Sequence, residues 1–374
     1  MSSKPSLCFF NTSAAMPHML LGEGPARSGG AQVRASIVAR ALAERGWPVT
    51  FVIRDYGQPA ETFTAEGIRV LKASGQKQGL PLLRVLTHTI PADMRAVGTA
   101  DADIHIEFGL SWRTGLLVRE AHKRRRRFML WLAHILDPQA GLPGISMIPS
   151  HWRWSAIRGL AESDMVIAQT HEQAVLMQKL HGRTCPVVPN VWVLTESHGP
   201  KSDPPEVLWA ARYLPLKRPE WVLEIAQRLP DVRFVMAGGP GEGQDALFSQ
   251  IQQAAASIPN VDVLGFVPFS EIDQYYARAS ALLCTSTVEG FPNTFLQAWN
   301  HRTPVVSTFD PDGVLARHGV GIACNDVEEL VGGIQRVCGA EGAALGERCR
   351  AYLEQVHSGE AVMNALEPLL AALV

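Results

Sequence analysis

The sequence predicts an α/β protein with two doubly wound, parallel-sheet domains that face each other across a cleft. Short apolar runs alternate with amphipathic helical patterns along almost the whole chain, as is typical of parallel sheets with helices on both faces. The alternation stops near residue 195 and restarts near residue 206. The chain also has 374 residues, which is more than one hydrophobic core normally serves.

The first series of strands and helices occupies residues 1–195. After its first strand, an amphipathic helix carries Val33, Ile37 and Leu42 on one stripe and ends at Gly46. Its predicted strands are the apolar runs at residues 7–10, 49–53, 68–71, 103–106, 128–133, 165–168 and 186–188. The order of these elements favours a complete domain in this half of the chain.

A second series follows at residues 206–357, after a linker that reads Gly-Pro-Lys-Ser-Asp-Pro-Pro at residues 199–205. Helices are predicted at 220–228 and 245–256, and strands at residues 207–210, 233–237, 261–264, 281–284 and 305–307. A last apolar helix is predicted within residues 358–374. Periodicity leaves open whether it packs on the second domain or crosses back to the first.

Composition limits the class of protein. Hydrophobic residues make up 47% and charged residues 19%, as in ordinary globular enzymes, and the net charge of −2 excludes a globally basic nucleic-acid binder. No apolar run reaches the roughly 18 residues of a membrane span, and the first apolar run is too short for a signal peptide. The six cysteines include no Cys-x-x-Cys pair, so neither zinc nor a disulfide framework is indicated. We therefore expect a cytoplasmic protein without nucleic-acid partners.

The most specific pattern lies around a predicted helix start, where Glu289 comes just before the helix. The first turn of that helix is formed by Gly290, Phe291, Pro292, Asn293 and Thr294. Pro292 suits a helix start, and Asn293 or Thr294 can cap it. Free N–H groups there favour an anion, which would repel Glu289, so we expect this carboxylate to bind sugar hydroxyls instead. Gln297 is eight residues further along and lies on nearly the same helix face, so a nucleotide-sugar site is predicted.

Cationic and glycine residues extend this prediction. Arg212 and Lys217 lie in one loop after the first strand of the second series, where they could neutralise a diphosphate; a solvated loop is the alternative. Gly29 and Gly30 open the first helix and would allow close approach of a phosphate or a sugar. The alternative role of Glu289 is a helix-start charge that the helix dipole stabilises.

His134 ends a predicted strand and could orient a sugar or bind an acceptor; a structural histidine is the alternative. Two Asp-x-Asp strings, at residues 101–103 and 310–312, are potential metal ligands. Neither has a further ligand cluster nearby in the sequence, so we predict no metal.

The only basic run, residues 123–127, reads Lys-Arg-Arg-Arg-Arg at a predicted helix end. A solvated helix end is the favoured interpretation, and contact with anionic lipid on the inner face of a membrane, or with an anionic acceptor, is the alternative. Trp152 and Trp154 could form an aromatic platform or pack in the core.

Taken together, these segments resemble retaining glycosyltransferases of family 4 over nearly the whole chain. The similar segments are Ser28-Gly-Gly-Ala31, Val187-Val-Pro-Asn190, Ala211-Arg212 with Lys217, Gly265-Phe-Val-Pro268, and Glu289 with Gln297. The last pair resembles the family's Glu-x7-Glu motif, in which the second glutamate usually holds the ribose. Here that position is Gln297, which donates as well as accepts hydrogen bonds and carries no charge.

The resemblance implies the GT-B fold, with two Rossmann-like domains. It places the nucleotide sugar, a UDP- or GDP-sugar, mainly on the C-terminal domain, with Phe266 as a further donor-binding residue, and the acceptor mainly on the N-terminal domain. The acceptor would be a sugar, a lipid-linked compound or another hydroxyl compound in glycan, glycolipid or cell-envelope polysaccharide synthesis. No cofactor and no protein nucleophile are implied, and His134 would lie near the C6 hydroxyl of the sugar.

Two other functions stay open at this point. A nucleotide-sugar 2-epimerase has the same architecture, but the acid and base carboxylates that it needs cannot be located in the sequence. A catalytically weak sugar-nucleotide-binding protein is the second alternative, and Gln297 is the main argument for it. A dinucleotide-binding dehydrogenase is disfavoured, because no Gly-x-Gly-x-x-Gly follows the first strand and the spacing of residues 238–241 is wrong for it.

Overall fold

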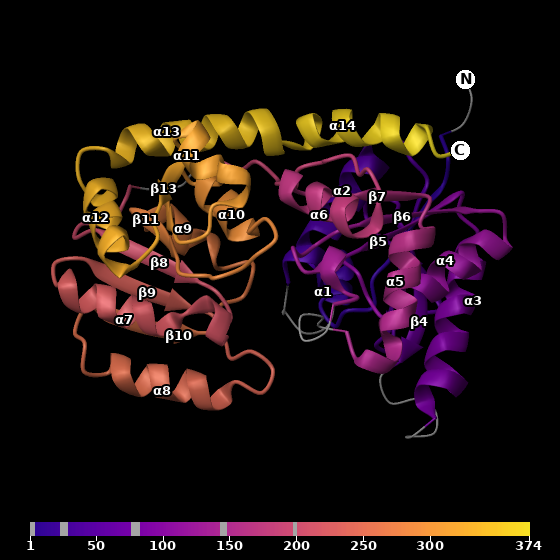
Figure 1. Ribbon diagram of the computed structural model, residues 1–374, viewed down its shortest axis with the longest axis horizontal. Coiled ribbons are helices and arrows are strands. Elements are labelled where there is room, and N and C mark those ends of the chain that lie inside the picture. Colours follow the sequence, from indigo (N-terminus) through magenta and orange to yellow (C-terminus); the bar gives the residue numbers. More distant parts are fainter. Residues whose placement is uncertain (1–3, 23–28, 76–82, 143–147, 197–199) are drawn as a thin grey trace. The chain divides into compact units, whose positions relative to one another are not determined.

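The computed structural model describes residues 4–22, 29–75, 83–142, 148–196 and 200–374. The chain divides into two compact units: residues 1–191 together with 359–374 form the first, and residues 192–358 form the second (Figure 1). Each unit contains a largely or wholly parallel sheet with helices on both faces, so the predicted α/β, doubly wound fold class is confirmed.

The sheet of the first unit has the strand order β3-β4-β2-β1-β5-β6-β7. Its strands are β1 Leu7–Phe10, β2 Val49–Asp55, β3 Glu61–Phe63, β4 Arg69–Gly75, β5 Ile104–Phe108, β6 Arg127–Trp131 and β7 Met165–Ile167. All neighbours are parallel except β3 and β4. The strand predicted at 186–188 is wrong, because this segment makes only one isolated bridge, from Val187 to Ala168.

Two hydrophobic clusters lie on opposite faces of this sheet. Leu7 and Phe9 of β1 belong to one cluster, while Cys8 and Phe10 belong to the other, as the alternation of side chains along a strand requires. One face is covered by α1 Met16–Leu21, α2 Gly30–Glu44 and α14 Gly359–Ala371. The other is covered by α3 Ile90–Ala100, α4 Thr114–Lys123, α5 Arg153–Glu162 and α6 His171–His181.

Helix α14 is thus a late segment of the chain that packs on an early one (Figure 1). Its side chains Val362, Met363, Leu366 and Leu370 are fully buried in the core that α2 covers. The indole of Trp47 also donates a hydrogen bond to Glu367 at 2.9 Å. Because each buried apolar side chain contributes about 1.5–3 kcal/mol, the first unit depends on this helix for its stability.

The sheet of the second unit is fully parallel, with the order β10-β9-β8-β11-β12-β13. Its strands are β8 Glu206–Ala210, β9 Arg233–Ala237, β10 Val261–Gly265, β11 Ala281–Cys284, β12 Val305–Ser307 and β13 Gly321–Ala323. Its helices are α7 Pro219–Arg228, α8 Asp245–Ala255, α9 Asp273–Arg278, α10 Asn293–Asn300, α11 Val314–His318, α12 Val327–Cys338 and α13 Gly342–Tyr352. Helices α7, α8 and α12 share one core, while α9 packs on β8 and α10 packs on β11 and β12.

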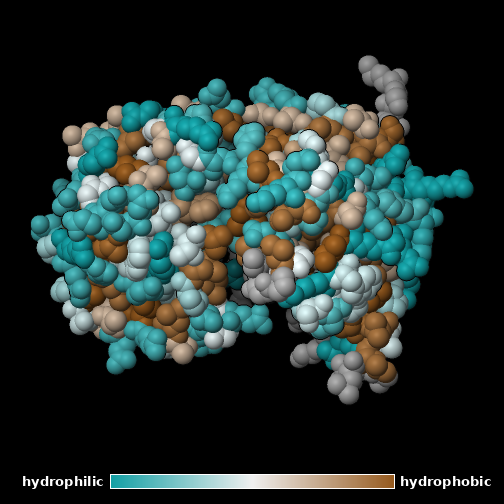
Figure 2. Space-filling view, in the orientation of Figure 1, coloured by the Kyte–Doolittle hydropathy of each residue, from teal (hydrophilic) through white to brown (hydrophobic). Residues whose placement is uncertain are grey.

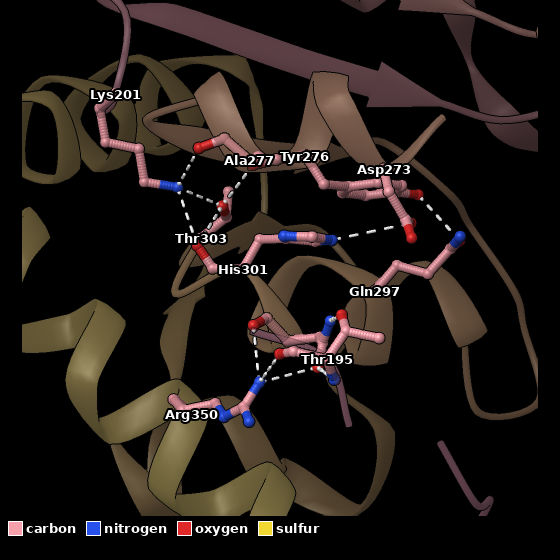
Figure 3. A network of polar contacts seen from close by, with 10 residues as sticks. Thr195, Lys201, Asp273, Tyr276, Ala277, Gln297, His301, Thr303 and Arg350 are labelled. Atoms are coloured by element: carbon pink, nitrogen blue, oxygen red, sulfur yellow. Dashed lines mark hydrogen bonds and ion pairs between the residues drawn. The ribbon is translucent and has the colours of Figure 1, made fainter. Parts of the chain in front are cut away.

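The segment predicted to be a linker is anchored within the second unit (Figure 3). Lys201 Nζ donates hydrogen bonds to the carbonyls of Ala277 and His301 and to the hydroxyl of Thr303, at 3.1, 3.0 and 2.6 Å. Burial lowers the pKa of Lys201 to about 8. Arg350 likewise donates to the carbonyl of Thr195 at 2.7 Å. These contacts fix the segment to α9 and to the turn that follows α10.

Candidate functional site

Two loops meet at the carboxyl ends of the central strands of the second unit: residues 211–218 after β8 and residues 285–292 after β11. The backbone N–H of Thr287 donates to the carbonyl of Leu216 at 2.9 Å. Arg218 fastens the loops further, because its Nε donates to the carbonyl of Thr285 and its Nη2 to the hydroxyl of Thr308, both at 2.6 Å. Arg218 is therefore a structural residue of this junction and not a solvated charge. A half-buried guanidinium needs partners, and the segments after β11 and β12 supply them.

Lys217 and Glu289 are brought together at this junction. Lys217 Nζ donates to Glu289 Oε1, and the two side chains are 15% and 17% exposed. The pair places one cation and one carboxylate side by side at the edge where ligands bind in open α/β sheets. Since one carboxylate oxygen is held by the ammonium group, the orientation of Glu289 is fixed.

Helix α10 begins at Asn293, directly after this pair. Pro292 is the N-cap residue, and no side chain caps the helix. Capping by Asn293 or Thr294 is therefore wrong, because both residues already lie inside the helix. In the turn before the helix, the ring of Phe291 lies 5.0 Å from that of His357. Gly290 is buried in the same turn.

Gln297 is 7% exposed and faces α9 (Figure 3). Its Oε1 accepts a hydrogen bond from the hydroxyl of Tyr276 at 3.2 Å, while its Nε2 has no hydrogen-bond partner among the described residues. The amide therefore ties α9 to α10 through its oxygen, and its N–H groups are the part that can still donate. A role of Gln297 in holding the ribose stays a prediction.

Arg212 and Phe266 are exposed, in loops after β8 and β10. Arg212 makes no hydrogen bond or ion pair with any residue that the structure describes. Next to it, the backbone N–H of Tyr213 donates to the carbonyl of Gly239 at 3.0 Å. Gly238, with a φ of 151°, allows this approach, because a Cβ there would overlap the carbonyl oxygen of Ala211. Gly238 thus serves the packing of the Arg212 loop, which the spacing of the glycines alone did not indicate.

In the first unit, Gly29 is the N-cap residue of α2 and Gly30 is its first residue. A side chain at Gly29 would collide with the amide of Gln32. His134 follows β6 and accepts a hydrogen bond at Nδ1 from the backbone N–H of Leu136 at 3.1 Å. A neutral His134 ring therefore carries its hydrogen on Nε2, which makes Nε2 the donor.

The backbone of His134 is fixed by a neighbouring carboxylate. Asp137 Oδ2 accepts hydrogen bonds from the backbone N–H groups of Ala133 and His134 at 2.7 and 3.0 Å. Burial raises the pKa of Asp137, and these two bonds act in the opposite direction. The position of His134 is thus set by hydrogen bonds of its own loop.

Glu107 is a charged residue of the first unit that was not predicted from the sequence. Glu107 lies near the carboxyl end of β5, one residue beyond the predicted strand, and lines a pocket of the first unit. Its position directly after a predicted parallel strand is the signal that could have found it, because strand ends of this kind carry ligand-binding residues.

The Asp-x-Asp strings have structural partners. Asp103 accepts hydrogen bonds from the backbone N–H of Ser6 at 2.8 Å and from Arg126 at 2.7 Å. Asp310 accepts from the backbone N–H of Leu315 in α11 at 2.8 Å. No cluster of three metal-ligating side chains occurs within the described ranges. Activity without metal stays a prediction.

The basic run is largely neutralised by nearby carboxylates. Lys123 and Arg124 pair with Glu120, Arg126 pairs with the Asp-x-Asp string at residues 101–103, and Arg127 pairs with Asp164. The run also lies at the amino end of β6, at the opposite edge of the sheet from His134. These contacts favour the interpretation of the run as a helix end over contact with anionic lipid or with an anionic acceptor.

Trp152 lies 4.7 Å from Trp112 and 6.1 Å from Trp154, ring to ring, and Trp154 is 52% exposed. These tryptophans form a surface cluster.

In the space-filling view, teal and brown side chains are interspersed over the visible face (Figure 2). Among the helices that the structure describes, none is long and apolar enough to cross a membrane.

Two family models match the chain. Residues 29–191 match a glycosyl transferase 4-like domain, and residues 204–339 match glycosyl transferases group 1. Among sequence relatives, the D-inositol 3-phosphate glycosyltransferase of Mycobacteroides abscessus is 26% identical over 228 residues, or 54% of this chain, and the match spans only 50% of that protein. The enzyme of the same name from Xylanimonas cellulosilytica is 26% identical over 76% of each chain.

Solved structures share the fold. A sucrose-phosphate synthase from Thermosynechococcus elongatus aligns with a TM-score of 0.79 at 17% identity, covering 99% of both chains. HepE from Anabaena, solved with UDP and glucose, aligns with a TM-score of 0.75 at 18% identity, covering 99% of this chain and 100% of that one. The same protein was also solved with UDP-glucose.

Proposed function

Because this chain belongs to the family-4-like glycosyltransferases with the GT-B fold, we propose that it moves a sugar from a nucleotide diphosphate sugar to a hydroxyl acceptor, with retention of the anomeric configuration. The observation that carries the proposal is the Lys217–Glu289 pair, held at the start of α10 by two interlocked loops. Such a pair offers a cation to a diphosphate and a carboxylate to sugar hydroxyls at the junction of the two loops.

The reaction would use charge stabilisation and positioning. The acceptor oxygen forms a bond to the anomeric carbon while the bond from that carbon to the diphosphate breaks, and the leaving diphosphate takes the acceptor proton. Negative charge develops on the diphosphate, where Arg212, Lys217 and the first N–H groups of α10 would stabilise it. Glu289 would hold the donor sugar on the same face, and Gly29, Gly30 and Phe266 are further proposed donor contacts.

We propose a UDP-sugar as the first donor to test. The support is the structural likeness to HepE, which was solved with UDP-glucose. The sequence relatives are named for a phosphorylated polyol, D-inositol 3-phosphate. A GDP-sugar is the second donor to test.

The direct test measures release of the nucleoside diphosphate and transfer of the sugar across a panel of UDP- and GDP-sugars and polyol acceptors. We expect transfer that survives saturating chelator, because cationic side chains would take the place of a metal. Loss of transfer that manganese restores would contradict the metal-free proposal. Conversion of a donor to its 2-epimer without any acceptor would favour the epimerase, and binding without turnover would favour a binding protein.

His134 offers a second test. We expect His134→Ala to lower transfer about 30-fold and nucleotide affinity less than threefold, because its Nε2 hydrogen would bind the reacting sugar and not the nucleotide. His122→Ala is a matched control, since His122 is exposed and pairs with Asp164 at 2.8 Å at the other edge of the sheet. Equal losses in transfer and affinity, or no loss in either, would return His134 to a structural role.

A further inference from the structure

A pocket of ≈ 280 Å³ opens in the first unit at the carboxyl ends of β1, β2 and β5. The polar residues that matter here are Thr12 after β1, Gln32 in the first turn of α2, Arg54 near the end of β2, Glu107 near the end of β5, and Arg113 before α4. The pocket therefore gathers side chains from separate parts of the chain at the edge of the sheet where ligands bind.

Glu107 is the most deeply buried charged group of this pocket, at 5% exposure. Its Oε1 accepts a hydrogen bond from the hydroxyl of Ser111 at 2.7 Å, while its Oε2 has no hydrogen-bond partner among the described residues. Burial raises the pKa of Glu107 to about 7, although the hydroxyls of Ser111 and Thr114 and the charge of Arg113 act in the opposite direction. A buried carboxyl oxygen without a partner is costly unless a ligand satisfies it.

The two arginines of the pocket differ in their partners. Arg113 Nε donates to Asp93 Oδ2 at 2.8 Å, and Asp93 is fully buried, so the charge of Arg113 is compensated within the protein. The guanidinium of Arg54 is partly buried and makes no hydrogen bond or ion pair with any other residue that the structure describes. Arg54 and Glu107 thus line one pocket without pairing with each other, and each can bind a different group of the same ligand.

We propose that this pocket binds the acceptor and selects one that carries both hydroxyl groups and an acidic group, that is, a sugar or other polyol bearing a phosphate or a carboxylate. Arg54 holds the acidic group, because a guanidinium matches the geometry of both acids. Glu107 Oε2 binds a hydroxyl of the same molecule. This inference rests on the glycosyl-transfer function proposed above, and it adds the chemical class of the acceptor.

The test is direct binding to the full chain without nucleotide, by calorimetry. The probes are glucose, galactose, mannose and myo-inositol, their monophosphates, the three corresponding uronic acids, and inorganic phosphate alone. We expect at least one acidic polyol to bind about tenfold or more tightly than its neutral parent and than inorganic phosphate, which corresponds to about 1.4 kcal/mol. Comparison of the dissociation constants of the sugar phosphates and the uronic acids shows which acidic group the pocket prefers.

Three variants assign the binding to the pocket. Arg54→Gln should remove the preference for the acid, and Glu107→Gln should weaken acidic and neutral polyols alike. Arg119→Gln is the matched control, because Arg119 is exposed on α4 and outside the pocket, and it should change neither. The inference is overturned if no acid is preferred over its neutral parent, if the preference survives in Arg54→Gln, or if inorganic phosphate binds as tightly as the sugar phosphates.

Binding of UDP and GDP to the same protein separates this inference from the proposed function. If a nucleotide binds and sugar is transferred but no acidic polyol is preferred, the acceptor class is wrong and the transferase function stands. If acidic polyols bind through Arg54 but no nucleotide sugar is turned over, the transferase function is wrong and the pocket stands as a binding site.

Discussion

At the carboxyl ends of the strands, the second unit pairs two oppositely charged side chains with each other, whereas the first unit leaves two oppositely charged side chains apart in one pocket. Lys217 and Glu289 are paired, and Arg218 fastens three strand ends. In the first unit, Arg54 and Glu107 line one pocket without pairing. Charged groups that are already held in place suit a part of the ligand that does not vary, such as a diphosphate. Charged groups without a partner in the protein favour the ligand that supplies those partners, and this makes the site specific.

The largest effect is expected from the cations of the second unit. Lys217→Ala and Arg212→Ala should each lower transfer by about 100- to 1,000-fold, because each would remove stabilisation of charge that develops on the leaving diphosphate. Arg228→Ala is the control, since this arginine pairs with Glu224 on the surface of α7. Steady-state rates together with melting temperatures separate a loss of chemistry from a loss of folding. Near-normal turnover in both variants would remove the proposed phosphate site.

The unmatched carboxyl of the first unit should give a pH dependence of stability. Because the pKa of Glu107 is about 7 in the folded protein and 4.5 ordinarily, the folded chain holds a proton that the unfolded chain loses between these pH values. The free energy of unfolding should therefore fall as pH rises from about 4.5 to 7, on the order of 2 kcal/mol more than in Glu107→Gln. Urea unfolding at a series of pH values measures this difference, and parallel pH profiles for the two proteins would contradict it.

The role of Arg218 in fastening the two loops of the second unit can be tested through the free energy of unfolding. Arg218→Ala should lower the free energy of unfolding by about 1.5 kcal/mol, because two carbonyls and a hydroxyl lose a charged donor. Arg302→Ala is a matched control: both arginines have a positive φ, 44° and 52°, but Arg302 makes a surface pair with Glu347. The control should lose less than about 0.5 kcal/mol. Equal losses in the two variants would mean that the loops are not held by Arg218.

The smallest expected effects concern the two residues of the Glu-x7-Glu-like motif. Glu289→Gln should weaken use of the donor about tenfold, or about 1.4 kcal/mol, because a neutral amide pairs poorly with Lys217 and binds hydroxyls less strongly. Gln297→Glu should be tolerated, since an oxygen remains to accept from Tyr276. Calorimetry with nucleotide measures both variants. A tenfold or greater loss for Gln297→Glu would show that the amide is specifically required.

Strands that are buried on both faces could be predicted from the sequence, and small edge strands could not. The ranges predicted for β1, β9, β11 and β12 agree with the structure residue for residue, because each is an uninterrupted apolar run or nearly so. The strands β3 and β13 were not predicted. Each has three residues and lacks a fully buried side chain, so hydrophobic periodicity carries no signal there.

The candidate site was predictable where local rules apply and not where distant partners decide. The position after a parallel strand identified Lys217, the position before a helix start identified Glu289, and the structure pairs them. The clamping role of Arg218 depends on acceptors 67 to 90 residues away, which no local pattern reveals. The capping prediction was wrong because Pro292 is the N-cap residue of α10, so Asn293 and Thr294 already lie inside the helix.

Helix α14 has a consequence for the order in which the protein is assembled during synthesis. The polypeptide emerges from its amino end, so the strands of the first sheet and helix α2 leave the ribosome before the whole second unit and before α14. At about 5–20 residues per second, synthesis of residues 192–374 takes roughly 10–35 s. During that interval the apolar surface that Val362, Met363, Leu366 and Leu370 will cover has no helix over it. The core of the first unit therefore cannot close until the whole second unit has been synthesised.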